Sequence, residues 1–194
     1  MNEIENWFKE REKIYSFISA DKDFFEEIQR ASVLLNESFK KGGKLLIFGN
    51  GGSAAEAQHF AAELIGRFEK KRMAIPAIAL TTDTSIITAQ ANDESFSTIF
   101  SRQIEALGNE GDIALGMTTS DAGGDDRHSE NIRLAFETAR NKNLKTIGLF
   151  SEKTKNLLEL VDVPLIVKNN QTALIQEIHL SIIHLLCRLI ENNT

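Results

Sequence analysis

Cysteine is nearly absent from the 194-residue sequence: Cys187 is the only one, so the chain cannot form an internal disulfide. Cys187 lies within an apolar helical pattern, which favours a small residue of the protein core. Basic residues are outnumbered by acidic ones. The formal net charge of -6 argues against broad binding to nucleic acid or to a membrane surface, while leaving room for a local basic pocket.

Several kinds of segment are also missing. Residues 1–20 hold no basic-then-apolar leader, and no apolar run looks long enough to span a bilayer. Internal repeats and low-complexity stretches are not found. The length suits one domain with a substantial buried core. The sequence therefore predicts a single cytoplasmic domain over residues 1–194, with no nucleic-acid or membrane partner.

Short apolar runs alternate with helical stretches along most of the chain. The run at 45–48 is followed by a glycine turn at 49–53 and by good helix formers at 53–65, with Gly66 placed to end that helix. The remaining stretches favour strands at 76–80, 113–117, 145–150 and 164–167, and helices at 84–91 (broken by Asn92 and Asp93), 96–107, 130–141, 154–160 and 173–191. This alternation predicts an α/β fold with a five-stranded parallel sheet covered by helices on both faces.

Two amphipathic helices are expected before the first strand, at about residues 2–19 and from an N-cap at Asp21 to about residue 40. A small sheet does not require both of them. Their apolar faces either pack on another subunit of an oligomer or simply cover the sheet, and the sequence favours neither alternative.

The glycine turn, Gly49-Asn50-Gly51-Gly52-Ser53, has the features of an anion site. The first turn of the following helix leaves N–H groups without partners, and glycines let a phosphate come close to them. Ser53, a good N-cap residue, adds a hydroxyl donor. The Walker loop and the dinucleotide fingerprint are both absent, because Ala54 follows the turn and the glycine spacing differs. A tight strand-to-helix turn without a ligand explains the pattern equally well.

Hydroxyl side chains follow two more of the predicted strands, at Thr81-Thr82-Asp83 and at Thr118-Thr119-Ser120. Ligands of parallel sheets bind beyond the carboxyl ends of the strands, where these segments meet the glycine turn. One such cluster is usually a helix cap. Two that converge with the glycine turn indicate a site for a phosphate ester.

His59 and Glu63 lie four residues apart on the expected helix, on one face and about 6 Å apart along its axis. An imidazole and a carboxylate so placed can chelate one metal ion or act as a proton-transfer pair. For an isolated pair of this kind, a solvated face or a structural hydrogen bond is the ordinary alternative.

Several segments together resemble the phosphoheptose isomerase family, a branch of the sugar isomerase (SIS) fold. They run in order through the chain from about Phe24 to Glu191, at 49–53, 59–63, 76–84, 92–93, 102–108, 111–112 and 176–179. The resemblance implies a three-layer, flavodoxin-like α/β sandwich that assembles as a homotetramer with active sites at subunit interfaces. It also implies interconversion of sedoheptulose 7-phosphate and D-glycero-D-manno-heptose 7-phosphate, the first step toward nucleotide-activated heptose. Many members bind zinc.

Residue roles follow from the resemblance at matching positions. Glu63 and His184 would be the acid–base pair, and Arg67 would lie near the site. The remaining roles are substrate contacts at Asn50, Gly51, Gly52, Ser53, Asn92 and Asp93, phosphate contacts at Thr118, Thr119 and Ser120, and one zinc per subunit on His59, Glu63, Gln176 and His184.

The last helix raises a question of geometry. Gln176 and His184 are eight residues apart, about 12 Å along the helix axis, so to share one ion both side chains must lean inward or come from different subunits. Gln176 is also expected among the substrate contacts. His179, on the same helix, is interpreted as a histidine of a polar interface.

The loop at 121–128 departs from the family pattern, because it is longer and carries three aspartates. Ser129 is the candidate replacement for a later phosphate-binding serine. The aspartates would repel a phosphate unless they point outward, bind a cation or pair with Arg127. Because of this loop, an isomerase of another sugar phosphate is one alternative to the heptose isomerase. A second alternative is a non-catalytic SIS-fold protein of the replication-initiator-associating type, which resembles this sequence through much of the chain. That subgroup lacks the carboxylate and the imidazole kept here at Glu63 and His184.

Overall fold

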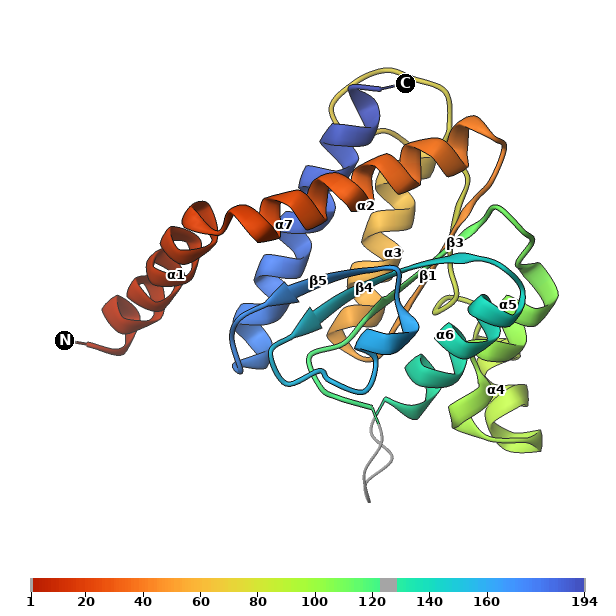
Figure 1. Ribbon diagram of the computed structural model, residues 1–194. Helices are drawn as coiled ribbons and strands as arrows, with labels where there is room; N and C mark the ends of the chain where they lie inside the picture. The colour runs from red at the N-terminus through yellow and green to blue at the C-terminus, as the bar shows by residue number, and fades with distance from the viewer. Residues whose placement is uncertain (1, 123–128, 194) are drawn as a thin grey trace.

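Five parallel strands form the centre of the computed structural model, which describes residues 2–122 and 129–193 (Figure 1). The strands are β1 (Leu45–Gly49), β2 (Ala77–Ala79), β3 (Ile113–Met117), β4 (Lys145–Ser151) and β5 (Val163–Val167), in the spatial order β2-β1-β3-β4-β5. From β1 the chain adds β2 on one side and then β3, β4 and β5 on the other, so the switch point of the sheet lies between β1 and β3. In doubly wound sheets a ligand binds at this point, beyond the carboxyl ends of the strands.

Helices cover both faces of the sheet, which confirms the predicted three-layer sandwich. Leu45 and Ile47 of β1 face α2 (Lys22–Lys40), α3 (Gly52–Ile65) and α7 (Thr172–Glu191). Leu46 and Phe48 face the other layer, which holds α4 (Thr84–Asp93), α5 (Ser101–Leu107) and α6 (Glu130–Asn141). Successive strand residues point to opposite faces, so an apolar run without alternation, such as β1, is buried on both sides.

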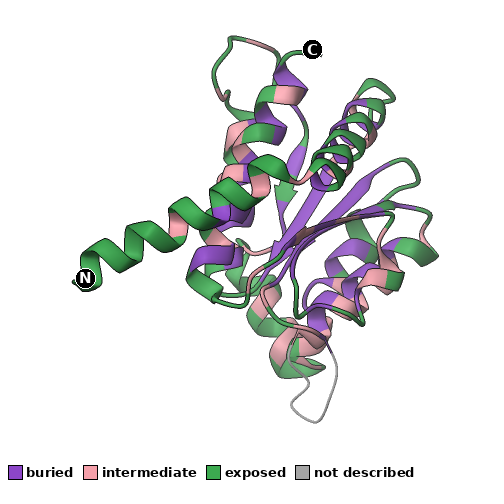
Figure 2. Cartoon of the chain, turned by 60° about the vertical axis from the view of Figure 1, so that its left-hand side comes forward, coloured by how far each residue is buried: buried purple, intermediate pink, exposed green. Residues whose placement is uncertain are grey.

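The two N-terminal helices behave differently from each other. Asp21 caps α2 as expected, accepting the N–H of Phe24, and α2 packs on the sheet and on α7. In contrast, α1 (Glu3–Ala20) projects from the body and buries only Ile14 (Figures 1 and 2). Trp7 and Phe8 stay 49% and 66% exposed. Within one chain, α2 thus covers the sheet, whereas the apolar side chains of α1 are left for another surface.

Three local expectations are wrong. Asn92 and Asp93 form the last turn of α4, and the chain leaves the helix at Glu94. The stretch 96–107 is two pieces, the 3₁₀ turn η1 (Phe96–Thr98) and α5, because Ser95 caps a short turn with its own side chain. At 154–160 only the 3₁₀ turn η2 (Leu158–Leu160) forms.

The last helix, α7, also corrects the sequence reading. Among the described residues it is the one helix whose length and apolar composition would suffice to cross a membrane. Half of that apolar stretch is buried in the fold, against α2, α3 and β5. Its composition is thus that of a core helix. Cys187 is among its fully buried residues, as expected, and burial raises the pKa of its thiol to about 12.

Candidate active site

The loops that follow β1, β3 and β4 meet the start of α7 at the carboxyl edge of the sheet. Thr119, after β3, donates a hydrogen bond to Thr172 at the first residue of α7 (3.4 Å) and accepts one from Ser151 of β4 through its carbonyl (3.0 Å). One turn further along α7, Gln176 lies against Gly52: a Cβ on Gly52 would be 2.4 Å from Gln176 Nε2. A side chain at position 52 would therefore force the end of the Gln176 side chain to move, and glycine permits this close approach.

A hydroxyl cluster forms where β3 ends. The Thr118 and Ser129 hydroxyl oxygens are 3.1 Å apart, and the N–H of Ser120 donates to Thr118 Oγ1 (3.1 Å). Ser129 has a left-handed backbone (φ 56°) at the N-cap of α6 and makes no side-chain cap bond there. Three of the hydroxyl residues expected at the phosphate are thus brought together with the N-terminus of a helix.

The acidic loop is described only at its start. Asp121 accepts hydrogen bonds from the N–H groups of Asn156 (3.0 Å) and Ala122 (3.0 Å), so its carboxylate is tied to the backbone. The other two aspartates and Arg127, whose pairing was considered above, lie at 123–128, outside the described residues.

The glycine turn differs from expectation at Ser53. The N-cap of α3 is Gly51 (φ 55°), and Ser53 lies in the first turn, 2% exposed, with its side chain hydrogen-bonded to Glu56. Asn50 exchanges two hydrogen bonds with Asn131 of α6, both 2.9 Å. Asn50, Gly51 and Gly52 stay exposed, and at the two glycines the exposed atoms are backbone, which suits an anion held by N–H groups.

Glu56 also faces His179 of α7 in the core. His179 is fully buried and not at a polar interface, which corrects the sequence interpretation; its Nε2 contacts the carbonyl of Phe150 (3.3 Å). Its Nδ1 is 4.0 Å from Glu56 Oε2, and neither atom has a hydrogen-bond partner among the described residues. Burial raises the pKa of Glu56 to about 7, against the opposing hydrogen bond from Ser53, and lowers that of His179 to about 4.

His59 brings the proposed acid–base residues to one place. Its Nε2 is 2.9 Å from Nε2 of His184 and 3.5 Å from Oε1 of Glu63. The ring of Phe68, in the loop after α3, stacks on the His184 ring with centroids 5.3 Å apart and planes 19° apart. A carboxylate on α3 and an imidazole on α7 thus lie against the same nitrogen, within one chain.

The donor types in this cluster suit zinc. Tetrahedral zinc with nitrogen ligands at about 2.1 Å spaces those ligands roughly 3.4 Å apart, and the contacts of His59 at 2.9 and 3.5 Å bracket this value. The contact between Nε2 of His59 and Nε2 of His184 needs a proton on one nitrogen and a lone pair on the other. As they stand, however, no three His, Cys, Asp or Glu side chains within 2–122 and 129–193 are gathered around one point.

Gln176 is not part of this cluster. It contacts Gly52, which precedes His59 by seven residues, about 10 Å along the axis of α3. Within one chain the last helix thus presents Gln176 to the glycine turn and His184 to His59, in accord with the 12 Å separation expected from the sequence.

Three other candidate residues face outward. Arg67 is exposed and makes no ion pair within the described part of the chain. Asn92 and Asp93 are exposed at the end of α4 and hydrogen-bond to each other (2.8 Å). Within residues 2–122 and 129–193, no hydrogen bond or ion pair joins these three residues to the hydroxyl cluster or to His59.

Sequence reasoning missed several residues around these groups. Thr172, Asn131 and Phe68 each contact a candidate residue from a distant part of the chain. The sequence could have indicated Glu56, because it lies three residues after Ser53 and therefore on the same face of that helix. For the others there was no such indication, since their contacts depend on how α6 and α7 pack.

Comparison with known proteins gives one answer. The SIS domain family model matches residues 6–151. A phosphoheptose isomerase of Campylobacter jejuni serotype O:6 (strain 81116) is 46% identical over 191 residues, which is 98% of both chains. One of Citrifermentans bemidjiense is 49% identical over 164 residues, 84% of this chain and 82% of the relative.

Solved structures agree in fold and in length. A phosphoheptose isomerase from Francisella tularensis has a TM-score of 0.89 to this chain at 37% identity, and the match covers 97% of this chain and 96% of the other. Family model, sequence relatives and structure therefore all span most of the molecule. The chain belongs to the SIS domain family and, within it, to the phosphoheptose isomerases.

Proposed function

We infer that this protein converts sedoheptulose 7-phosphate to D-glycero-D-manno-heptose 7-phosphate. One observation carries the inference beyond the family: Glu63 and His184, from helices far apart in the sequence, both lie against His59 Nε2. A replication-initiator-associating role has no comparable support, because the relatives named above are isomerases.

Moving a carbonyl between C1 and C2 needs a base that removes the proton next to the carbonyl and an acid that returns one to the neighbouring carbon. We assign the base to the Glu63 carboxylate and the acid to the His184 imidazole, with an enediol(ate) between the two steps. Half-burial of both side chains limits water access while leaving the pair open to a substrate.

The phosphate end is assigned to the carboxyl edge of the sheet. Thr118, Thr119, Ser120 and Ser129 offer hydroxyls there, and the backbone N–H groups of the glycine turn add donors. From Ser53 to His59 is about 9 Å along α3. A seven-carbon sugar carries its carbonyl and its phosphate at opposite ends, so a separation of this kind suits the substrate.

Turnover by the purified protein tests the function. We expect conversion of sedoheptulose 7-phosphate, and weaker or no conversion of pentose and hexose phosphates run in the same panel. Preference for a shorter sugar phosphate would instead support the isomerase of another substrate that the 121–128 loop suggested.

We propose that one zinc ion per subunit is held by His59, Glu63 and His184, with Gln176 reaching it only after movement or from another subunit. Bound zinc would polarise the substrate oxygens. Metal analysis should find about one zinc per chain, His59→Ala should lower that content, and chelator should reduce turnover until zinc is restored. Full activity in zinc-free protein would contradict the proposed role of zinc.

We also propose that the protein acts as a cytoplasmic homotetramer with shared active sites. The exposed apolar residues of α1 support an interface. So do Arg67, Asn92 and Asp93, which are exposed and, among the described residues, have no hydrogen bond or ion pair to the hydroxyl cluster. Light scattering should give about four times the chain mass of 21.6 kDa. A monomer with full activity would contradict the shared site.

A further inference from the structure

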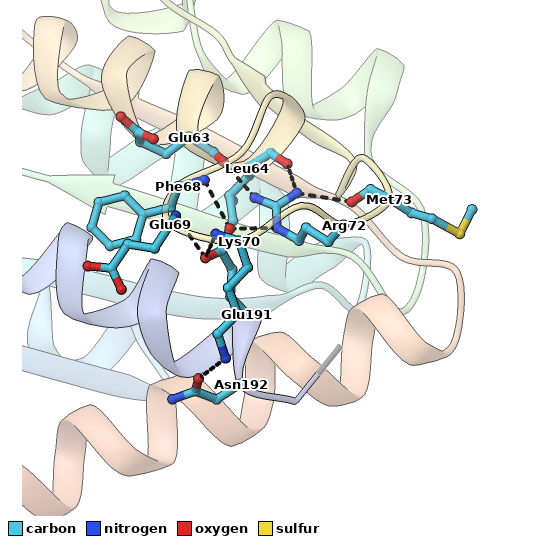
Figure 3. Close-up of polar contacts among 9 residues, drawn as sticks. All are labelled: Glu63, Leu64, Phe68, Glu69, Lys70, Arg72, Met73, Glu191 and Asn192. Atoms are coloured by element: carbon cyan, nitrogen blue, oxygen red, sulfur yellow. Dashed lines mark hydrogen bonds and ion pairs between the residues drawn. The ribbon is translucent and has the colours of Figure 1, made fainter.

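The segment between α3 and β2, residues 66–76, has no regular helix or strand, yet it is tightly held by one residue of α7. Glu191 accepts the N–H groups of Phe68 (2.9 Å), Glu69 (2.9 Å) and Lys70 (3.0 Å), as Figure 3 shows. Its side chain is 2% exposed. A carboxylate can accept four hydrogen bonds, and three consecutive backbone donors fill most of that capacity.

Arg72 completes the arrangement. Its Nε donates to Glu191 Oε1 (3.0 Å), and its side chain is 6% exposed. Its Nη2 donates to the carbonyl of Glu63 (2.6 Å) and its Nη1 to that of Leu64 (2.7 Å) (Figure 3). These carbonyls belong to the last turn of α3, where no intrahelical donor remains for them, so Arg72 closes the end of the helix.

The charge of Glu191 is maintained in this setting. Burial alone would raise the pKa of the carboxyl, but the N–H groups of Phe68, Glu69 and Lys70 and the charge of Arg72 together bring it below its ordinary value. The contact is therefore a buried ion pair with hydrogen bonds on both partners, which has a narrow range of allowed geometries.

Both proposed acid–base residues depend on this pair. The N–H of Phe68 is fixed by Glu191, and the Phe68 ring stacks on His184. The carbonyl of Glu63 is fixed by Arg72. One buried carboxylate at the end of α7 thereby connects the base on α3 to the acid on α7.

We propose that Glu191 and Arg72 are positioning residues of the isomerase, which set the placement of Glu63 relative to His184 through the 68–72 loop. This assignment rests on the proposed function for its kinetic consequence but not for its geometry. Arg72 reaches Glu63 only at its backbone carbonyl, and within the described residues no hydrogen bond or ion pair joins Glu191 or Arg72 to the Glu63 carboxylate or the His184 ring. The effect therefore travels through Phe68 and through the end of α3.

The test compares Glu191→Gln with Glu69→Gln. Glu69 and Arg188 form an exposed ion pair (3.0 Å) between the same loop and the same helix, so Glu69→Gln removes a charge there while keeping the backbone N–H that Glu191 binds. We expect Glu191→Gln to lower kcat on sedoheptulose 7-phosphate by on the order of tenfold or more, with KM within about twofold, because small misplacements of reacting groups reduce the rate steeply. Glu69→Gln should leave both parameters at the wild-type value.

A second readout does not need turnover. The Phe68 ring shifts the NMR signals of the His184 ring protons, and Phe68→Leu, which keeps the Glu191 contacts, gives their position without the stacked ring. In Glu191→Gln the signals should move toward that reference. If the His184 signals move in Glu191→Gln but the wild-type protein shows no turnover, the positioning role would be supported and the isomerase function rejected.

The proposal would be overturned if Glu191→Gln folds and has wild-type kcat and unmoved His184 signals. If Glu191→Gln does not fold, it would be overturned by a Phe68→Leu protein with wild-type kcat. If Glu191→Gln does not fold, a loss of kcat in Phe68→Leu at unchanged KM supports it.

Discussion

Replacing Glu63 with glutamine is expected to lower the rate of isomerisation by about 10²- to 10⁴-fold, the usual contribution of a positioned general base. Glutamine keeps the shape of the side chain and an oxygen that can face His59, but it cannot accept the proton from the carbon next to the carbonyl. The measurement is kcat on sedoheptulose 7-phosphate. Incorporation of deuterium from D₂O into recovered substrate should fall in parallel, because proton removal is the step that is lost.

His184→Gln and the double variant complete this experiment. Each single change should be severe, and the double variant should be little worse than the worse single one, because residues that act as one unit are not additive. Zinc content is measured on all three, which separates loss of the metal from loss of the base. Glu105→Gln, an exposed carboxylate that pairs with Arg102 on α5, is the control for charge removal and should retain full activity. Full activity in both single variants would rule out the assigned roles.

The fold followed from local pattern to a large extent. The strand at 113–117 and the helix at 130–141 have the predicted bounds, because each is an unbroken periodic run between clear breaks. Periodicity did not give the strand order β2-β1-β3-β4-β5, because the order depends on how strands far apart in the sequence pair with one another. Where polar residues were read as breaks, as at Asn92 and Asp93, the helix continued, since a polar last turn is compatible with an exposed helix such as α4.

The candidate site was predictable only within single elements. His59 and Glu63 share a helix face, so their spacing alone indicated a pair. Contact between His59 and His184 joins positions 125 residues apart, and no local pattern contains it. The same holds for Glu191, whose partners are the side chain of Arg72 and three backbone N–H groups, a donor that every residue except proline possesses. Ser53 was misjudged because Gly51 took the N-cap position.

Changing Glu56 or His179 is expected to tilt the pH dependence of stability in opposite directions. The pKa of Glu56 is about 7 in the folded protein against 4.5 in an unfolded chain, so its contribution to stability is present below pH 4.5 and is lost as the pH rises through 7. The pKa of His179 is about 4 against 6.5, so its contribution is present above pH 6.5 and is lost as the pH falls toward 4.

In the wild type these contributions offset each other between pH 4.5 and 6.5. Folded protein holds one proton on the pair, on Glu56, and the unfolded chain also holds one, on His179, so folding takes up no net proton there. Glu56→Gln should remove one side of this balance. Its free energy of unfolding minus that of the wild type should rise between pH 4.5 and 7, by up to about 3 kcal/mol.

His179→Gln should show the reverse: its difference from the wild type should fall as the pH rises from 4 to 6.5, also by up to about 3 kcal/mol. Urea denaturation at a series of pH values measures both, at one fixed protein concentration, because association into the proposed tetramer would add to stability. The double variant should differ from the wild type by a constant amount between pH 4.5 and 6.5. If the curves of unfolding free energy against pH are parallel for Glu56→Gln and the wild type, Glu56 is ionised in the folded protein. The 4.0 Å separation between Glu56 Oε2 and His179 Nδ1 would then reflect two lone pairs that face each other, and not a proton held by the carboxyl.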